Sequence, residues 1–310
     1  MAGCFYNEDR MARRSIVSLA VNIAVNHLLA APPKPLLASF KLTYRCNLRC
    51  EQCPFPGFQG SDSSFAQICG TLDELYRRGD RIVIFEGGEP LLWHDTGSTG
   101  KEFNDIVRYA RKKFACVGVT TNGTLPLEMD ADVVWVSVDG FAETHDRLRR
   151  APIFERVIEN IRRSKHPRLY AHITANTENH AEIPDLVRFL EGLVKGISVQ
   201  FYYPYGSEDR LFLPWPERQR LLARLIAMKK AGSPILNSSA ALRALRNNSW
   251  RCLPERIDCV NPDGEVWQGC YLRSRTEIDC SKCGFSPYTE MSLAFRGNPQ
   301  AVWAGYKIFF

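Results

Sequence analysis

The residues with the clearest chemical potential are three cysteines in one short loop, Cys46, Cys50 and Cys53. They are spaced C-x3-C-x2-C and follow the apolar stretch Leu36–Tyr44, which we expect to be a β-strand. Cysteine thiolates hold iron–sulfur clusters, and a cubane cluster has four irons to ligate. Three cysteines leave one iron open, and an open position at a metal is where chemistry takes place. We interpret them as candidate catalytic and metal-binding residues.

Two other interpretations of this loop are a zinc site and ordinary structural cysteines. A structural zinc site normally uses four ligands, usually as two separated pairs. Three cysteines this close together would need a distant fourth ligand. The spacing therefore favours an iron–sulfur cluster.

Further polar turns follow the next expected strands, at Gly87–Pro90, Thr121–Gly123, Ser137–Gly140 and Ala175–Thr177. Ligands of parallel α/β proteins bind at the carboxyl ends of the strands, so these turns belong to one edge. Glycines without a Cβ atom let the backbone approach a ligand closely, and a carboxylate can bind an ammonium group. Taken alone, each turn could be a simple strand–helix connection. The candidate cofactor-binding residues are Gly87, Gly88, Glu89, Pro90, Asn122, Ser137, Asp139 and Asn176.

A second group of cysteines lies near the end of the chain. Five cysteines cannot fully ligate two cubane clusters, so we expect one auxiliary cluster. A four-cysteine zinc site is the alternative. The candidate ligands, strongest first, are Cys270, Cys280 and Cys283, then Cys252, with Cys259 the doubtful one.

The bulk composition indicates a globular protein of 310 residues with 45% hydrophobic and 24% charged residues. The formal charge of +6 comes from scattered basic residues, so we expect no nucleic-acid partner. Eleven cysteines clustered in a long chain indicate metal ligands in a reducing compartment rather than disulfides. The expected location is therefore the cytoplasm.

Strand and helix signals alternate along the chain, which predicts parallel strands joined by right-handed crossovers. Periodicity alone allows either a partial barrel or an open doubly wound sheet. Only between Thr121 and Val133 is there no room for a full helix. Expected strands are Leu36–Tyr44, Arg81–Phe85, Ala115–Thr121, Val133–Val138, Leu169–Ala175 and Ile197–Tyr203; expected helices are Phe65–Arg78, Glu102–Lys113, Phe154–Ser164, Ile183–Val194, Pro216–Lys230 and Ser238–Asn247.

Residues 11–31 predict an amphipathic helix, because polar residues recur every three or four positions on an otherwise apolar stretch. The simpler interpretation is a helix packed against the main domain. The alternative is peripheral contact with the inner membrane face, since basic amphipathic helices lie in that interface.

The cysteine loop followed by Gly87-Gly88-Glu89-Pro90 resembles the signature of the radical SAM enzymes. The resemblance implies a partial (β/α)6 TIM-like barrel over residues 36–205 and a [4Fe–4S] cluster whose open iron chelates S-adenosylmethionine (SAM). It further implies reductive cleavage of SAM to a 5′-deoxyadenosyl radical, a methionyl amino group held at Gly87–Pro90, and ribose contacts from Ser137 and Asp139. Such an oxygen-sensitive enzyme would take electrons from a donor such as flavodoxin or ferredoxin.

The tail from Cys252 to Cys283 resembles the SPASM/twitch appendage of radical SAM enzymes, which holds auxiliary iron–sulfur clusters. Gly269–Leu272 and Cys280–Phe285 are also similar to the enzymes that join an adenosyl group to a hopene lipid, although this tail is more compact. The resemblance implies an apolar or lipid-type small molecule as substrate, with maturation of a ribosomal peptide as the alternative. A non-catalytic metal-binding or electron-transfer protein is the alternative of another class.

The expected architecture is an α/β fold with four parts. A barrel lies between an N-terminal amphipathic helix and a small cysteine-rich C-terminal appendage. The expected parts are residues 1–35 (helical segment), 36–205 (barrel), 206–249 (helical linker region) and 250–310 (auxiliary-cluster domain).

Overall fold

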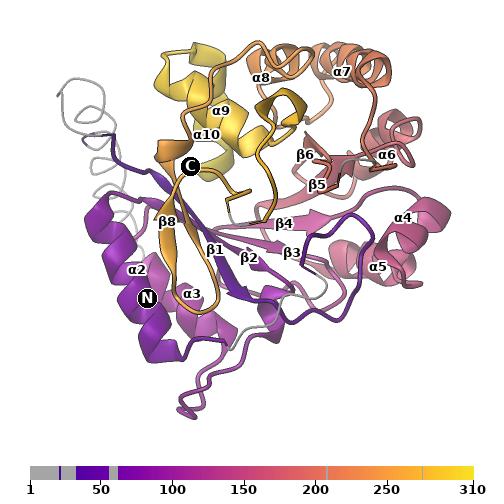
Figure 1. Ribbon diagram of the computed structural model, residues 1–310. Helices are drawn as coiled ribbons and strands as arrows, with labels where there is room; N and C mark the ends of the chain where they lie inside the picture. Colours follow the sequence, from indigo (N-terminus) through magenta and orange to yellow (C-terminus); the bar gives the residue numbers. More distant parts are fainter. Residues whose placement is uncertain (1–20, 22–32, 56–61, 207–208, 274) are drawn as a thin grey trace, which may run out of the picture.

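The computed structural model describes residues 21, 33–55, 62–206, 209–273 and 275–310, and its centre is one eight-stranded sheet (Figure 1). The strand order is β6-β5-β4-β3-β2-β1-β7-β8. The strands are β1 (Leu37–Thr43), β2 (Ile82–Gly87), β3 (Cys116–Thr121), β4 (Val133–Ser137), β5 (Leu169–Ala175), β6 (Gly196–Phe201), β7 (Ile257–Val260) and β8 (Val266–Gln268). Strands β1 to β7 pair in parallel, and only β8 runs antiparallel to its neighbour. The α/β fold expected from the alternating pattern is confirmed.

Helices α2 to α6 surround the outside of the curved sheet (Figure 1). The helices are α2 (Phe65–Arg78), α3 (Phe103–Arg111), α4 (Ala142–Arg149), α5 (Phe154–Arg163), α6 (Ile183–Leu190), α7 (Trp215–Lys230), α8 (Ser239–Ala244), α9 (Ser286–Phe295) and α10 (Pro299–Phe309), with 3₁₀ turns η1 (Pro90–Leu92), η2 (Pro254–Arg256) and η3 (Cys280–Lys282). Helix α2 begins at a capping box of Ser64 and Gln67, and ends at Gly79 with φ of 131°. No helix connects β3 to β4, as the sequence predicts.

The tail of the chain joins the main sheet. Strands β7 and β8 form a hairpin, and β7 also pairs with β1 in parallel from Leu37 opposite Ile257 to Phe40 opposite Val260. The division of the chain at residue 250 remains a proposal.

Helices α9 and α10 cover the amino ends of the strands. First residues of several strands, among them Leu37, Ile82 and Ile257, share one buried apolar cluster with Met291 and Phe295 of α9. On β4, the ring of Trp135 lies 6.1 Å from that of Phe309. The tail therefore closes the end of the sheet opposite to the cysteine loop.

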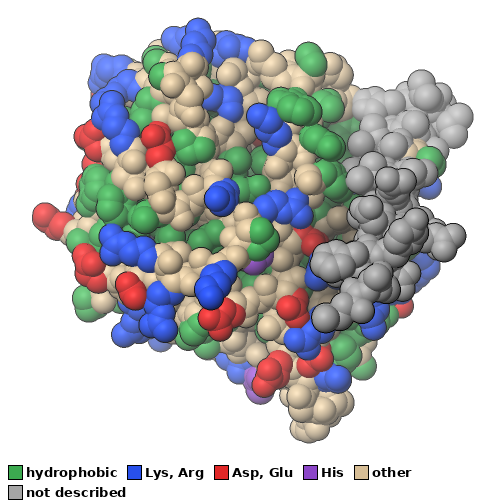
Figure 2. All heavy atoms as spheres, turned by 180° about the vertical axis from the view of Figure 1, so that it is seen from behind, with side chains coloured by type: hydrophobic (Ala, Val, Ile, Leu, Met, Phe, Trp, Pro, Cys, Tyr) green, Lys and Arg blue, Asp and Glu red, His purple; other side chains and the backbone are tan. Residues whose placement is uncertain are grey.

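No helix among the described residues is long and apolar enough to cross a membrane. The amphipathic helix expected over residues 11–31 lies, apart from Val21, outside the described part of the chain and stays a prediction. On the face seen in Figure 2, basic and acidic side chains are interspersed. The described side chains on that face form no continuous basic patch of the kind that binds nucleic acid.

Candidate active site

One cavity of about 940 Å³ lies on the inner side of the curved sheet and extends from the cysteine loop to α9 and α10. Of the residues that the sequence singles out, seven line it: Cys46, Cys50, Cys53, Gly87, Gly88, Asn122 and Ser137. The predicted cluster loop and part of the predicted cofactor site therefore face the same space.

Hydrogen-bond donors surround the three sulfurs of the loop. The amide N of Leu48 lies 3.4 Å from Cys46 Sγ, and the side-chain amide of Asn122 approaches the same sulfur at 3.8 Å. Arg149 Nη1 lies 3.8 Å from Cys50 Sγ. Such donors favour thiolates, the form that binds metal. Burial raises the pKa of Cys53 to about 12, so this chain without a cluster carries a thiol there and releases its proton on ligation.

The glycines after β2 are required because their turn packs against the cysteine loop. A Cβ on Gly87 would lie 2.5 Å from the carbonyl oxygen of Thr43, and one on Gly88 would lie 2.2 Å from that of Arg45. The amides of Gly88 and Glu89 donate to these same two oxygens. The two glycines thus let the turn after β2 pack closely against the start of the cysteine loop, whether or not a ligand also lies beside them.

Glu89 is fully buried and is not among the residues that line the cavity. Its carboxylate accepts hydrogen bonds of 2.8 Å from the Thr121 hydroxyl and the Asn122 amide, which tie the turn after β2 to the turn after β3. Burial raises its pKa. Pro90 begins η1 and is also away from the cavity wall. The predicted contact between Glu89 and an ammonium group remains a prediction.

Asp139 and Asn176 also lie behind the cavity wall, where both are fully buried. The Asp139 carboxylate accepts hydrogen bonds from Gln52 Nε2 at 2.6 Å and from the amide of Thr174 at 3.0 Å. The Asn176 side-chain oxygen accepts from the amide of Glu178, and its nitrogen has no hydrogen-bond partner. In this structure, Ser137 rather than Asp139 faces the cavity.

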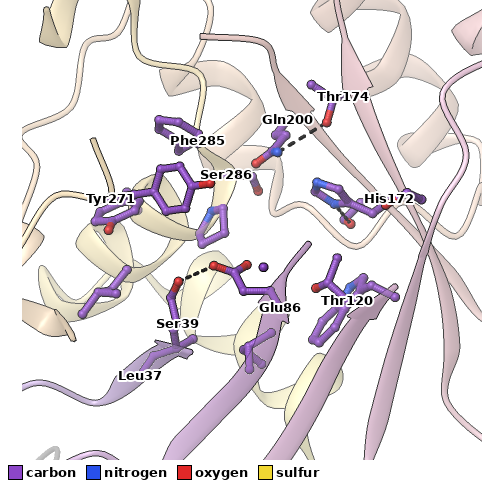
Figure 3. A pocket seen from close by; sticks show the side chains of 18 of the residues that line it. Leu37, Ser39, Glu86, Thr120, His172, Thr174, Gln200, Tyr271, Phe285 and Ser286 are labelled. Carbon is purple, nitrogen blue, oxygen red and sulfur yellow. Dashed lines mark hydrogen bonds between the residues drawn. The ribbon is translucent and has the colours of Figure 1, made fainter. Parts of the chain in front are cut away.

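A ring of polar side chains inside the sheet was not foreseen from the sequence (Figure 3). On β5, His172 Nδ1 lies 2.8 Å from Ser198 Oγ. Burial lowers the pKa of His172 to about 4, so its imidazole is neutral. Lys41 is fully buried and pairs with Glu86 at 3.3 Å. A signal for this ring exists, because polar residues occupy alternate positions in otherwise apolar strands, as Ser39 and Lys41 do on β1.

The cavity becomes apolar toward α9 and α10. Among the described residues, the only basic side chains on its wall are Arg45, Arg49 and Arg149, at or beside the cysteine loop. The far half is lined by Leu37, Ile82, Ile84, Trp135, Ile257, Met291, Phe295 and Phe309. The two halves thus suit different chemistry: the basic side chains lie at the cysteine end, whereas the other end is mostly apolar, with Glu290 of α9 as its acidic member.

Four tail cysteines lie close to one another. Burial and the neighbouring Cys283, Cys270 and Cys280 together raise the pKa of Cys252 to about 12. Cys259 is buried on β7, where its Sγ lies 3.6 Å from the Tyr288 hydroxyl. It also contributes to the raised pKa of Cys270. Cys252, Cys270, Cys280 and Cys283 thus influence one another while Cys259 is fully buried, and their role as ligands stays a prediction.

Within the described ranges, no three His, Cys, Asp or Glu side chains are arranged to hold a single metal ion. A cubane cluster assigns one thiolate to each iron instead of several to one ion. Three thiols on one cavity wall, each beside a hydrogen-bond donor or a cation, are therefore the donor set that such a cluster needs.

Comparison with known proteins identifies the family. The model of the Radical SAM superfamily matches residues 40–190. Pre-heme d1 synthase of Dinoroseobacter shibae is 28% identical over 57% of this chain and 46% of its own length. The subtilosin biosynthesis protein AlbA of Bacillus subtilis is 29% identical over 70% and 51%, and an AdoMet-dependent heme synthase of Methanosarcina barkeri is 28% identical over 91% and 86%. The match thus spans about half the length of the first of these relatives.

Solved structures share the fold. Streptococcus suis SuiB bound to S-adenosylmethionine has a TM-score of 0.64 at 14% identity, covering 96% of this chain and 71% of that one. Native anSMEcpe with bound AdoMet and the Kp18Cys peptide has a TM-score of 0.58 at 15% identity, covering 85% and 83%. The sheet therefore matches the partial barrel of these proteins. Family model, fold and cysteine loop agree: residues 40–190 of this chain match the Radical SAM superfamily, which implies a [4Fe–4S] cluster and SAM.

Proposed function

We propose that this enzyme holds a [4Fe–4S] cluster on Cys46, Cys50 and Cys53 and modifies an apolar or lipid-type small molecule inside its barrel. When bound, the cluster supplies the electron that cleaves SAM to a 5′-deoxyadenosyl radical. An external reductant such as flavodoxin or ferredoxin would restore that electron. One auxiliary iron–sulfur cluster in the tail and a cytoplasmic location complete the proposal.

The chain's own residues prepare the carboxyl-end half of the cavity for SAM. Gly87 and Gly88 offer backbone groups on the wall beside the cysteine loop, where the amino acid end of SAM would bind. Asn122 and Ser137 offer an amide and a hydroxyl on the next strands for the nucleoside. The Arg149 guanidinium lies 3.8 Å from Cys50 Sγ and would offset part of the negative charge of a bound cluster.

The observation that carries the proposal is the continuity of the cavity. The same space that begins at the three cysteines ends among Trp135, Met291, Phe295 and Phe309. A radical formed at the first end would meet a substrate that fills the second, and a filled apolar chamber excludes water from the reaction.

The charge distribution supports an uncharged, apolar substrate portion. Lys41 and Glu86 neutralise each other, and the basic side chains of the wall are confined to the cysteine end. Burying an unpaired carboxylate in such surroundings is costly. A substrate with several carboxylates in the far half is therefore disfavoured, even though some relatives are heme synthases.

Maturation of a ribosomal peptide is the second candidate. It is favoured by relatives such as AlbA and the sporulation killing factor maturation protein SkfB, which is 26% identical over 49% of this chain. A short peptide gene beside this one would favour the peptide, whereas lipid-biosynthesis genes would favour the apolar small molecule.

Radical formation is tested by anaerobic reconstitution with iron and sulfide, reduction with dithionite, and chromatography for 5′-deoxyadenosine. We expect product from the wild type and from Cys69→Ala, a half-buried cysteine of α2 that lies outside the site. Cys50→Ala should form none. Equal product from Cys50→Ala, or none from cluster-loaded wild type, would overturn the proposal.

A further inference from the structure

Arg218 of α7 is a buried cation without an acid. It is 1% exposed. Its Nε donates to the carbonyl of Leu245 at 2.9 Å, and its Nη2 donates to the carbonyl of Cys283 at 2.9 Å and to Asn248 Oδ1 at 3.1 Å. Its Nη1 has no partner, and no described carboxylate lies within ion-pair distance. An arginine stays charged in proteins, and an uncompensated buried charge is strongly destabilising.

Aromatic rings hold the guanidinium but do not neutralise it. Its central carbon lies 4.4 Å from the ring centroid of Phe201 and 4.7 Å from that of Trp215. Cation–π contacts are weaker than the attraction between opposite full charges. The position therefore still lacks a negative partner.

The groups around this cation belong to the tail cysteines. Asn248, which accepts from Arg218, donates its side-chain amide to the carbonyls of Cys280, Ser281 and Cys283 at 3.3, 2.8 and 2.9 Å. Arg218 and Asn248 thus support the turn η3 and the residue directly after it, Cys283, which together carry two of the four neighbouring thiols.

Metal ligation would create the missing negative charge. Four thiolates around a [4Fe–4S] core of charge +2 leave a net charge of about −2. We propose that Arg218 is the built-in counter-charge of a metal centre held by Cys252, Cys270, Cys280 and Cys283. The inference rests on the auxiliary centre of the proposed function and adds a positioning residue to it.

The counter-charge makes a prediction that a merely structural arginine does not. Arg218 stabilises the metal-loaded chain more than the metal-free chain, so its loss should reduce the increase in melting temperature that accompanies loading. A structural role alone would lower both melting temperatures equally. If the centre is iron–sulfur, loss of the cation also disfavours its reduced, more negative form.

The test uses the full chain with Cys46, Cys50 and Cys53 changed to Ala, so that only the tail binds metal. In this background Arg218→Gln is compared with Arg220→Gln, the same change at an exposed position two residues away on α7. After anaerobic reconstitution, metal and sulfide per chain, release to a chelator, melting temperatures with and without metal, and the EPR-monitored midpoint potential are measured. Should Arg218→Gln not fold, Arg218→Met removes the charge with a side chain suited to an apolar site.

We expect Arg218→Gln to release its metal roughly fivefold faster than Arg220→Gln and to gain less thermal stability on loading. At a fixed potential, the ratio of reduced to oxidised iron–sulfur centre should fall by about tenfold. Identical behaviour of the two variants, or equal destabilisation with and without metal, overturns the counter-charge and leaves the auxiliary centre standing. If the background chain takes up no metal, the counter-charge and the auxiliary centre are both overturned. Radical formation is tested separately, by measuring 5′-deoxyadenosine with the unmodified chain.

Discussion

The guanidinium of Arg149 lies 2.6 Å from the carboxylate of Asp139, at the point where the turn after β4 meets the cysteine loop. Both side chains are nearly inaccessible, with 11% and 1% of their surface exposed. The same guanidinium reaches Cys50 Sγ at 3.8 Å. Asp139 therefore acts on the cluster loop through Arg149, which differs from the ribose contact that the sequence alone suggests.

We predict that Asp139→Asn destabilises the metal-free chain, because it leaves Arg149 buried without its partner. Breaking a buried ion pair in this way costs about 3–5 kcal/mol. Asp130→Asn is the control, since Asp130 pairs with Arg108 on the surface and such pairs contribute about 0–1 kcal/mol. Thermal unfolding measures both. If the two variants melt alike and Asp139→Asn weakens only SAM binding, the ribose contact is favoured instead.

The sequence predicts the sheet well because buried parallel strands and amphipathic helices have strong periodic signals. The sequence does not predict helices α4, α9 and α10. In α4, only His145 and Leu148 are buried among charged residues, and α9 buries small polar residues such as Thr289 and Ser292 along with its apolar ones. Neither pattern produces a clear apolar stripe, so tertiary packing rather than periodicity defines these helices.

Of the candidate site, too, the sequence identifies one part and misses another. Spacing identifies the cysteine loop because the donors are adjacent in sequence. It does not identify His172 or Glu86, which meet only after β2 and β5 curve around one interior. Asp139 and Asn176, which the sequence suggests as ligand contacts, make local hydrogen bonds behind the cavity wall, and their contact with a ligand stays a prediction. Beside Asp139, His145 Nδ1 accepts a hydrogen bond from the Asp139 amide, and burial lowers the pKa of His145 to about 4, so its imidazole is neutral at pH 7.

A second prediction concerns the tail cysteines. Cys283→Ala should lose the auxiliary centre, whereas Cys259→Ala should keep its full metal content, because Cys259 is enclosed on β7 against Tyr288. Losing one sulfur from a packed interior costs Cys259→Ala about 1 kcal/mol of stability. Iron, zinc and sulfide analysis of the reconstituted variants checks this. Full metal content in Cys283→Ala together with loss in Cys259→Ala would exchange their roles.

Glu290 on α9 predicts a pH dependence of stability. Burial raises its pKa to about 7, opposed by hydrogen bonds from Ser238 and by the charge of Lys229 on α7. Because the unfolded carboxyl titrates near about 4.3, the folded chain retains a proton that the unfolded chain releases. The stabilisation from this group is therefore fully present below the unfolded pKa of about 4.3, and it is lost as the pH rises through the folded pKa of about 7.

We therefore expect Glu290→Gln to melt higher than the wild type at pH 8 by about 2–4 °C for each kcal/mol recovered. The difference should shrink at pH 4, where both folded and unfolded carboxyls are protonated. Glu191→Gln, at the exposed end of α6, is the control and should show no such change. A difference between Glu290→Gln and wild type that is the same at both pH values would contradict the assignment.

The apolar half of the cavity predicts which ligand enters it. Trp135 lines this half, with its ring 5.9 Å from that of Tyr170 and 6.1 Å from that of Phe309. A terminally brominated dodecanol bound there should quench the Trp135 fluorescence saturably. Trp135→Phe should abolish most of this quenching, whereas Trp303→Phe should retain it, because Trp303 is 56% exposed on α10.

The matching brominated dodecanoate should bind about tenfold more weakly, because the described residues in the far half of the wall offer its carboxylate no basic partner. Equal quenching of the wild type and Trp135→Phe would place the alcohol outside this chamber, and equal binding of alcohol and carboxylate would refute a preference for uncharged substrates. Neither result would affect the formation of 5′-deoxyadenosine, so the substrate class and the radical chemistry are tested independently.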